Sequence, residues 1–144
     1  YASQTGYGID ELYQELNRMS SKSTTVFLDA CFSGVNRNNE VLLANARPIS
    51  LRKNNSFTDK VNVYSAAGSK QISSSWPEKK HGLFSYFLMK GIRGDADANG
   101  DKKLTYGELG RYLEDNVSST AGLLDREQTP TLSTQNENNI FIAY

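Results

Sequence analysis

The sequence has few of the residues that cross-link a fold, and it has no long apolar run. A single cysteine among 144 residues excludes an internal disulfide. No hydrophobic stretch reaches the length of a membrane span, and the first residues do not resemble a signal peptide. Sixteen basic residues balance sixteen acidic ones, so the net charge gives no reason to expect nucleic acid or a membrane as a partner.

What is present fits one soluble globular domain, 1–144. The chain is 38% hydrophobic and 22% charged, which is ordinary for a soluble protein with a polar surface. Its length is enough to bury a core within a single domain. The chain begins at Tyr1, in mid-pattern and without an initiator methionine, so we expect it to be a piece of a longer product.

Hydrophobic periodicity predicts an α/β protein. Helical spacing of apolar residues indicates three helices, at 9–19, at 82–90 and from 105 onward. Runs of β-branched and apolar residues indicate three strands, at 24–31, 61–67 and 140–144. Gly91 is expected to end the second helix, and Thr105 with Glu108 to form a capping box at the start of the third. Residues 118–138 are polar, and no element is predicted there.

Polar chemistry follows directly on the first predicted strand. The apolar run from Thr24 to Leu28 leads into Asp29, Cys31 and Ser33. In open α/β sheets the carboxyl ends of the strands face the ligand crevice, so a thiol at this position is placed to act on a ligand. The alternative is a small, buried and inert cysteine. The strand alone does not decide between a reactive and an inert Cys31.

The stretch Leu28-Asp29-Ala30-Cys31-Phe32-Ser33-Gly34 resembles the Asp-x-Cys-x-Ser-Gly nucleophile motif of the caspase-like cysteine peptidases, which include metacaspases and bacterial caspase-like proteins. The likeness continues in the family's order through the segments 64–67, 81–88, 105–113 and 128–130. The resemblance implies a three-layer α/β/α caspase-like fold on a mostly parallel sheet, with the N-terminal strands outside this chain. It also implies a cysteine endopeptidase that needs no cofactor for its chemistry.

The resemblance assigns roles to four residues. Cys31 is the nucleophile that attacks the scissile carbonyl of a peptide or protein substrate, and its backbone amide contributes to the oxyanion hole. Asp29 forms the floor of the S1 pocket and favours Arg or Lys at P1; the alternative is a strand-end Asp bonded to loop amides. Ser65 lines S1 from the neighbouring strand. Trp76 borders S2, or else it packs over the edge of the core.

The dyad histidine of this family belongs to a Ser-Gly-His-Gly turn, which this sequence does not contain. His81 matches instead a His-Gly pair that precedes a later helix in bacterial members. The resemblance therefore implies that the dyad histidine lies upstream of Tyr1, in a segment with which this chain pairs. The alternative is a catalytically inactive caspase-like module that binds calcium or a protein partner.

The acidic segment 95–108 resembles an EF-hand calcium loop. When Asp97 takes the first position, the ligand positions fall on Asp97, Asn99, Asp101, Lys103 and Glu108. Lys102 then occupies the position that usually holds glycine. This pattern predicts a Ca²⁺ site, and the alternative is a solvated acidic turn whose Glu108 only closes the capping box. Glu108 can bind calcium and close the capping box at the same time.

The segment 35–60 lacks a regular pattern and is longer than most loops of a compact domain. If S1 accepts basic residues, this segment is a candidate processing loop. Its candidate cleavage sites are Arg37, Arg47, Arg52 and Lys53.

Overall fold

The computed structural model describes residues 8–30, 60–68, 71 and 73–144. Within them, a three-stranded sheet in the order β1-β2-β6 is formed by β1 (Thr24–Leu28), β2 (Val61–Ser65) and β6 (Thr131–Ser133). β1 and β2 are parallel, whereas β2 and β6 are antiparallel. The protein is therefore mixed α/β, and the expectation of a mostly parallel sheet is met only for the first pair.

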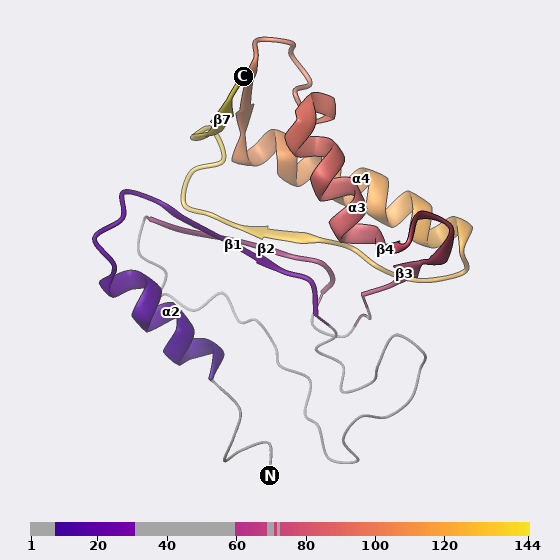
Figure 1. Cartoon of the computed structure of the whole chain (residues 1–144), viewed down its shortest axis with the longest axis horizontal. Coiled ribbons are helices and arrows are strands. Elements are labelled where there is room, and N and C mark those ends of the chain that lie inside the picture. Colours follow the sequence, from indigo (N-terminus) through magenta and orange to yellow (C-terminus); the bar gives the residue numbers. More distant parts are fainter. Residues whose placement is uncertain (1–7, 31–59, 69–70, 72) are drawn as a thin grey trace.

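Helices cover both faces of this sheet (Figure 1). The helix α2 (Ile9–Arg18) lies on one side. The helices α3 (Leu83–Lys90) and α4 (Tyr106–Leu123) lie together on the other side. Among the described residues, no helix is long and apolar enough to cross a membrane.

Strand alternation explains how two separate cores form on one sheet. Successive side chains of a strand point to opposite faces. Val61 and Val63 of β2 therefore pack with Tyr13 of α2, while Tyr64 between Val63 and Ser65 packs in the cluster that α3 and α4 build. In β1, Phe27 stacks on Tyr64 with ring centroids 5.3 Å apart.

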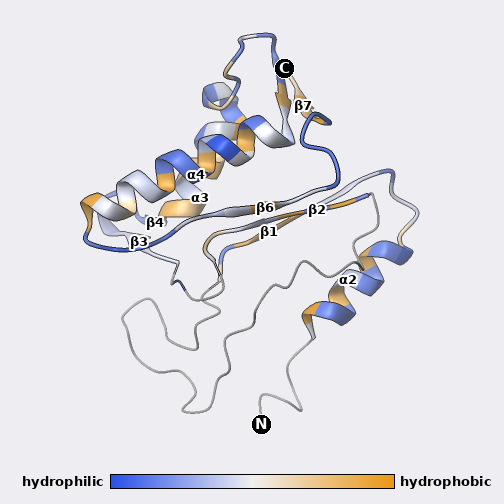
Figure 2. Ribbon diagram, turned by 180° about the vertical axis from the view of Figure 1, so that it is seen from behind, coloured by the Kyte–Doolittle hydropathy of each residue, from blue (hydrophilic) through white to orange (hydrophobic). Residues whose placement is uncertain are grey.

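The helix α2 follows its sequence pattern closely. It alternates hydrophobic and hydrophilic residues along its length (Figure 2), and its apolar residues Ile9, Tyr13 and Leu16 face the sheet. The predicted helix 9–19 is confirmed to within one residue, since Met19 is the C-cap.

The helix α3 ends at Lys90 with Gly91 as its C-cap, as predicted. Gly91 keeps a right-handed helical conformation, and the chain continues in a π-helical turn, η2 (Gly91–Asp95), which contains the positive φ of 120° at Gly94. The absence of a side chain at Gly91 matters for packing. A Cβ atom there would lie 2.9 Å from the Cδ1 of Leu109 and 3.1 Å from the Cδ1 of Tyr112, so its absence permits the close approach of η2 and α4.

The start of α4 is as predicted. Thr105 is the N-cap, its Oγ1 accepts from the backbone N–H of Glu108, and the Glu108 carboxylate accepts from the backbone N–H of Thr105. The helix runs to Leu123 through residues for which no element is predicted. Its buried face continues past Val117 to Ala121, because both remain in helical register with Leu113.

Two further two-stranded ladders complete the described structure. One is the hairpin of β3 (Ser75–Trp76) and β4 (His81–Gly82), whose connection contains the 3-10 helix η1 (Pro77–Lys79). The other pairs β5 (Lys103–Thr105) with β7 (Ile140–Ala143). The predicted final strand 140–144 thus exists, but it pairs with the segment before α4 and not with the main sheet.

Candidate functional site

The carboxyl ends of β1 and β2 lie side by side. The parallel register pairs Leu28 with Ser65, and the backbone N–H of Ala66 donates to the carbonyl of Leu28 at 2.8 Å. Asp29 therefore follows β1 at the point where β2 also ends. This is the edge at which an open α/β sheet presents its ligand-binding residues.

Two serine hydroxyls bind the carboxylate of Asp29. Ser73 donates to Oδ1 and Ser85 donates to Oδ2, each at 2.5 Å. Ser73 lies in the segment after β2 and is fully buried, and Ser85 lies in the first turn of α3. These distances lie at the short end of the range for a hydroxyl that donates to a carboxylate. Because each oxygen has its own donor, the plane of the carboxyl group is fixed.

The alternation along β1 accounts for the side on which Asp29 lies. Leu28 packs toward α2 and Phe27 packs toward α3 and α4. Asp29 continues this alternation onto the α3 side, where Ser85 meets it. Cys31, the predicted nucleophile, lies outside the described residues, as does the segment 35–59 with the predicted cleavage sites Arg37, Arg47, Arg52 and Lys53.

Ser65 is brought to the same sheet edge but is only 2% exposed. Its hydroxyl donates to the carbonyl of Ala67 at 3.1 Å, so it stabilises the turn after β2. A direct contact between Ser65 and substrate stays a prediction.

The segment after β2 is tied to the segment before β6 by Gln128. This residue is 1% exposed. Its Oε1 accepts from the backbone N–H of Ser74 at 2.7 Å, and its Nε2 donates to the carbonyl of Ala66 at 2.8 Å. Gln128 thus fixes the backbone next to Ser73.

Gln71 makes a second link between the same segments. Its Oε1 accepts from the backbone N–H groups of Gly68 at 3.2 Å and Thr129 at 2.8 Å. The sequence patterns did not single out Gln71, Ser73, Ser85 or the contacts of Gln128. No local signal marks them, since each acts on a residue distant in sequence or on the backbone.

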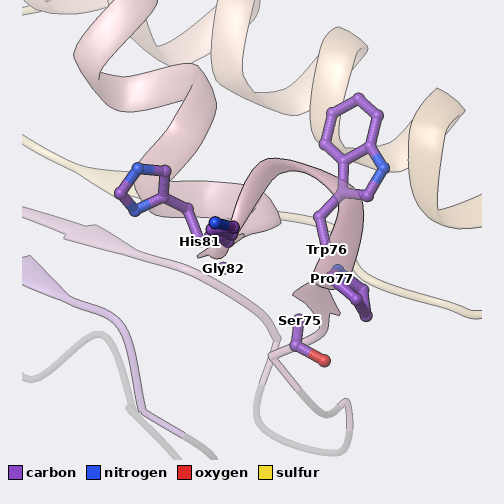
Figure 3. Close-up of a pocket in the computed structure, with 6 residues that line it drawn as sticks. Ser75, Trp76, Pro77, His81 and Gly82 are labelled. Atoms are coloured by element: carbon purple, nitrogen blue, oxygen red, sulfur yellow. The ribbon is translucent and has the colours of Figure 1, made fainter.

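Trp76 packs over the start of α3. Its ring is 5.2 Å from that of Tyr86 and 5.9 Å from that of Phe87, and the Nζ of Lys79 lies 5.6 Å from its centroid. This is the packing alternative considered for Trp76. Trp76 also lines a shallow pocket of about 270 Å³ on the β3–β4 hairpin (Figure 3). The residues that line this pocket are Ser75, Trp76, Pro77, Lys80, His81 and Gly82.

His81 belongs to this hairpin. It is exposed in β4, opposite Trp76 in the register, and the two side chains diverge from the hairpin (Figure 3).

Within the predicted calcium segment 95–108, residues 97–102 form a tight turn, which β5 and the start of α4 follow. Asp97 accepts backbone N–H groups with both oxygens, from Gly100 at 2.9 Å and from Lys102 at 3.0 Å. Asn99 and Asp101 each accept the backbone N–H two residues further on. Lys102 has a φ of 63°, which is the left-handed conformation that glycine usually supplies at this loop position.

Glu108 uses one oxygen in the capping box. Its Oε2 accepts from the backbone N–H of Thr105 at 3.0 Å and from the Thr105 hydroxyl at 2.7 Å. Within the part of the chain that the structure describes, no group of three or more His, Cys, Asp or Glu side chains is arranged to hold a metal ion. The capping box is thus confirmed, and calcium binding stays a prediction.

Comparison with known proteins does not assign the chain to a family. A scan against protein-family models finds no match, and a search of curated proteins finds none either.

Proposed function

We propose that this chain is the nucleophile-bearing part of a caspase-like cysteine endopeptidase that cleaves peptide bonds after Arg or Lys. The observation that carries the proposal is the carboxylate of Asp29, which lies at the shared carboxyl ends of β1 and β2 and is bound by two hydroxyls. It stands two residues before the only cysteine.

The arrangement of layers supports the fold part of this proposal. A sheet with α2 on one face and α3 and α4 on the other agrees with a three-layer α/β/α caspase-like architecture. In this reading, Asp29 and Cys31 follow a strand of the central layer, and the first turn of α3 contributes Ser85 to the pocket wall.

The proposed reaction proceeds by covalent catalysis. The Cys31 thiolate attacks the carbonyl carbon of the scissile peptide, and the amine product leaves with a proton from the dyad histidine of the N-terminal segment. Water then hydrolyses the thioester, which releases the carboxylic acid product and restores the thiol. The backbone N–H of Cys31 stabilises the oxyanion that forms in each step.

The Asp29 carboxylate supports the choice of a basic P1 residue. A guanidinium or ammonium group pairs with it, whereas an acidic P1 side chain is repelled. A charge-assisted hydrogen bond of this kind contributes about 1.5–3 kcal/mol, which corresponds to a selectivity of roughly tenfold to a hundredfold over a neutral side chain.

The test uses the complete protein that contains this chain, with fluorogenic peptides that end in Arg, Lys, Asp or citrulline at P1. We expect cleavage after Arg and Lys, a loss of activity of at least a thousandfold in Cys31→Ala, and loss of the preference for Arg over citrulline in Asp29→Asn. Equal turnover by Cys31→Ala, or a preference for Asp at P1, would contradict the proposal.

A second candidate function is calcium binding by a catalytically inactive module. The favouring observation is the loop of Asp97, which has the donor spacing and the left-handed residue of an EF-hand. Calcium titration by calorimetry, with Asp97→Asn and Glu108→Gln, tests it. Asp115→Asn is the matched control, because Asp115 is exposed on α4 outside the loop. Absence of calcium-dependent heat in the unmodified protein would exclude this candidate.

A further inference from the structure

We infer that Ser73 and Ser85 are positioning residues that set the preference of the S1 pocket for Arg over Lys by fixing the plane of the Asp29 carboxylate. This inference rests on the proposed function and goes further, because it assigns specificity to two residues that need not touch the scissile bond. We call Ser73 and Ser85 the Asp29 clamp.

The geometry of the clamp is specific. Ser73 and Ser85 bind different oxygens of Asp29, each at 2.5 Å. A single hydroxyl would leave the carboxyl group free to turn about its Cβ–Cγ bond. Two donors on two oxygens restrict that rotation, and the broad terminal torsion of an aspartate becomes a defined one.

The donors themselves are held by rigid parts of the fold. The backbone next to Ser73 is fixed on both sides of Ser74, whose N–H donates to Gln128 and whose carbonyl accepts the N–H of Leu83 at 2.9 Å. Ser85 is the third residue of α3 and follows Leu83 and Phe84, which are both fully buried. A site that is built on buried elements keeps its geometry before ligand arrives.

A fixed carboxylate plane affects arginine more than lysine. The planar guanidinium pairs with a carboxylate through two parallel hydrogen bonds, which require the two planes to be aligned. The ammonium of lysine acts as a compact point charge and tolerates a range of orientations. Each carboxylate oxygen can accept more than one hydrogen bond, so hydroxyl donors and a guanidinium can share the same group. The clamp therefore favours Arg over Lys at P1.

The experiment compares Ser73→Ala and Ser85→Ala with the unmodified complete protein, using peptides with Arg, Lys or citrulline at P1. We expect each substitution to lower kcat/KM for the Arg peptide about tenfold, to lower it for the Lys peptide by less than threefold, and to leave citrulline unchanged. Ser85→Thr keeps the hydroxyl and restores the Arg value. In the Asp29→Asn background, Ser85→Ala has no further effect.

Ser118→Ala is the matched control, because the Ser118 hydroxyl is buried on α4 without a hydrogen-bond partner among the described residues. It leaves all three peptides unchanged. Thermal unfolding of every variant separates a loss of fold from a loss of selectivity. An equal loss for Arg, Lys and citrulline in a folded Ser85→Ala variant would overturn the inference.

A binding measurement separates this inference from the proposed chemistry. Benzamidine, a rigid amidinium, is titrated into the same variants. We expect Ser85→Ala to weaken its Kd about tenfold and Ser85→Thr to preserve it, whether or not a peptide is cleaved. Absence of cleavage that depends on Cys31 would contradict the endopeptidase proposal alone, whereas equal benzamidine affinity of the unmodified protein and Ser85→Ala would contradict the clamp.

Discussion

The side-chain amide of Gln128 donates to the backbone carbonyl of Ala66 at 2.8 Å, across 62 positions of the sequence. The same side chain accepts the N–H of Ser74 at 2.7 Å. One buried glutamine thus holds the chain on both sides of the segment that carries Ser73.

Replacement of Gln128 by Ala should lower the free energy of unfolding by about 2–4 kcal/mol. The substitution leaves the N–H of Ser74 and the carbonyl of Ala66 buried without these partners and also removes packed volume. Urea unfolding measures the change. Gln135→Ala is the control, since Gln135 is exposed, and it should stay within about 0.5 kcal/mol. Similar unfolding midpoints for the two variants would contradict the role of Gln128.

Thr105→Ala should destabilise the protein by about 1 kcal/mol, because α4 loses its N-cap and the capping box. Thr105→Ser retains the hydroxyl and should recover most of this loss. Ser119→Ala removes an exposed hydroxyl within the same helix and serves as the control. It should be neutral or slightly stabilising, since Ala is the better helix former. A Thr105→Ala variant as stable as Ser119→Ala would argue against the cap.

Gly91→Ala and Gly122→Ala should have opposite effects, although both add one methyl group. At Gly91 the new Cβ would lie 2.9 Å from Leu109, so we expect a loss of about 1–3 kcal/mol. At Gly122 nothing lies within 4 Å of the new atom, and a gain of up to about 1 kcal/mol follows from helix propensity. Chemical denaturation measures both, and a gain in stability from Gly91→Ala as well would show that the approach of η2 to α4 is not tight.

Stability should fall at alkaline pH, in part through Tyr64. Burial raises the pKa of Tyr64 above its ordinary value of 10.0, and its hydroxyl donates to the carbonyl of Tyr106 at 2.8 Å. Above pH 10 the unfolded chain loses this proton while the folded protein retains it, so the free energy of unfolding decreases as the pH rises.

Tyr64→Phe removes this contribution and should make the alkaline decline shallower between pH 9 and pH 11. A decline remains, because burial also raises the pKa of Tyr13 and Tyr112. Urea unfolding at several pH values measures the slope. Parallel slopes for Tyr64→Phe and the unmodified protein would contradict the assignment.

Local periodicity was sufficient to predict the elements that bury a regular face. The helices α2, α3 and α4 and the strands β1, β2 and β7 lie where apolar spacing indicated them. The short strand β6 was missed, because Thr131, Leu132 and Ser133 carry too little pattern to differ from a polar loop. β6 forms a strand because it pairs with β2 in the folded protein, and not because of its own sequence pattern.

The acid of the candidate site was predictable, but its environment was not. Asp29 was predictable because it follows an apolar strand and stands two residues before the only cysteine of the sequence. Its partners Ser73 and Ser85 are 44 and 56 positions away. Serine is common in loops and at helix starts, and only the packing of α3 against the sheet brings these hydroxyls to Asp29.

The antiparallel pairing of β2 with β6 also affects how the protein folds. Ser65 pairs with Thr131, so both α3 and α4 lie between the two strands in the sequence. Contacts between such distant positions slow folding, because a long loop must close before they form. During synthesis, β2 cannot pair with β6 until both helices have been made. Until then, the edge of β2 that later pairs with β6 is exposed to other chains.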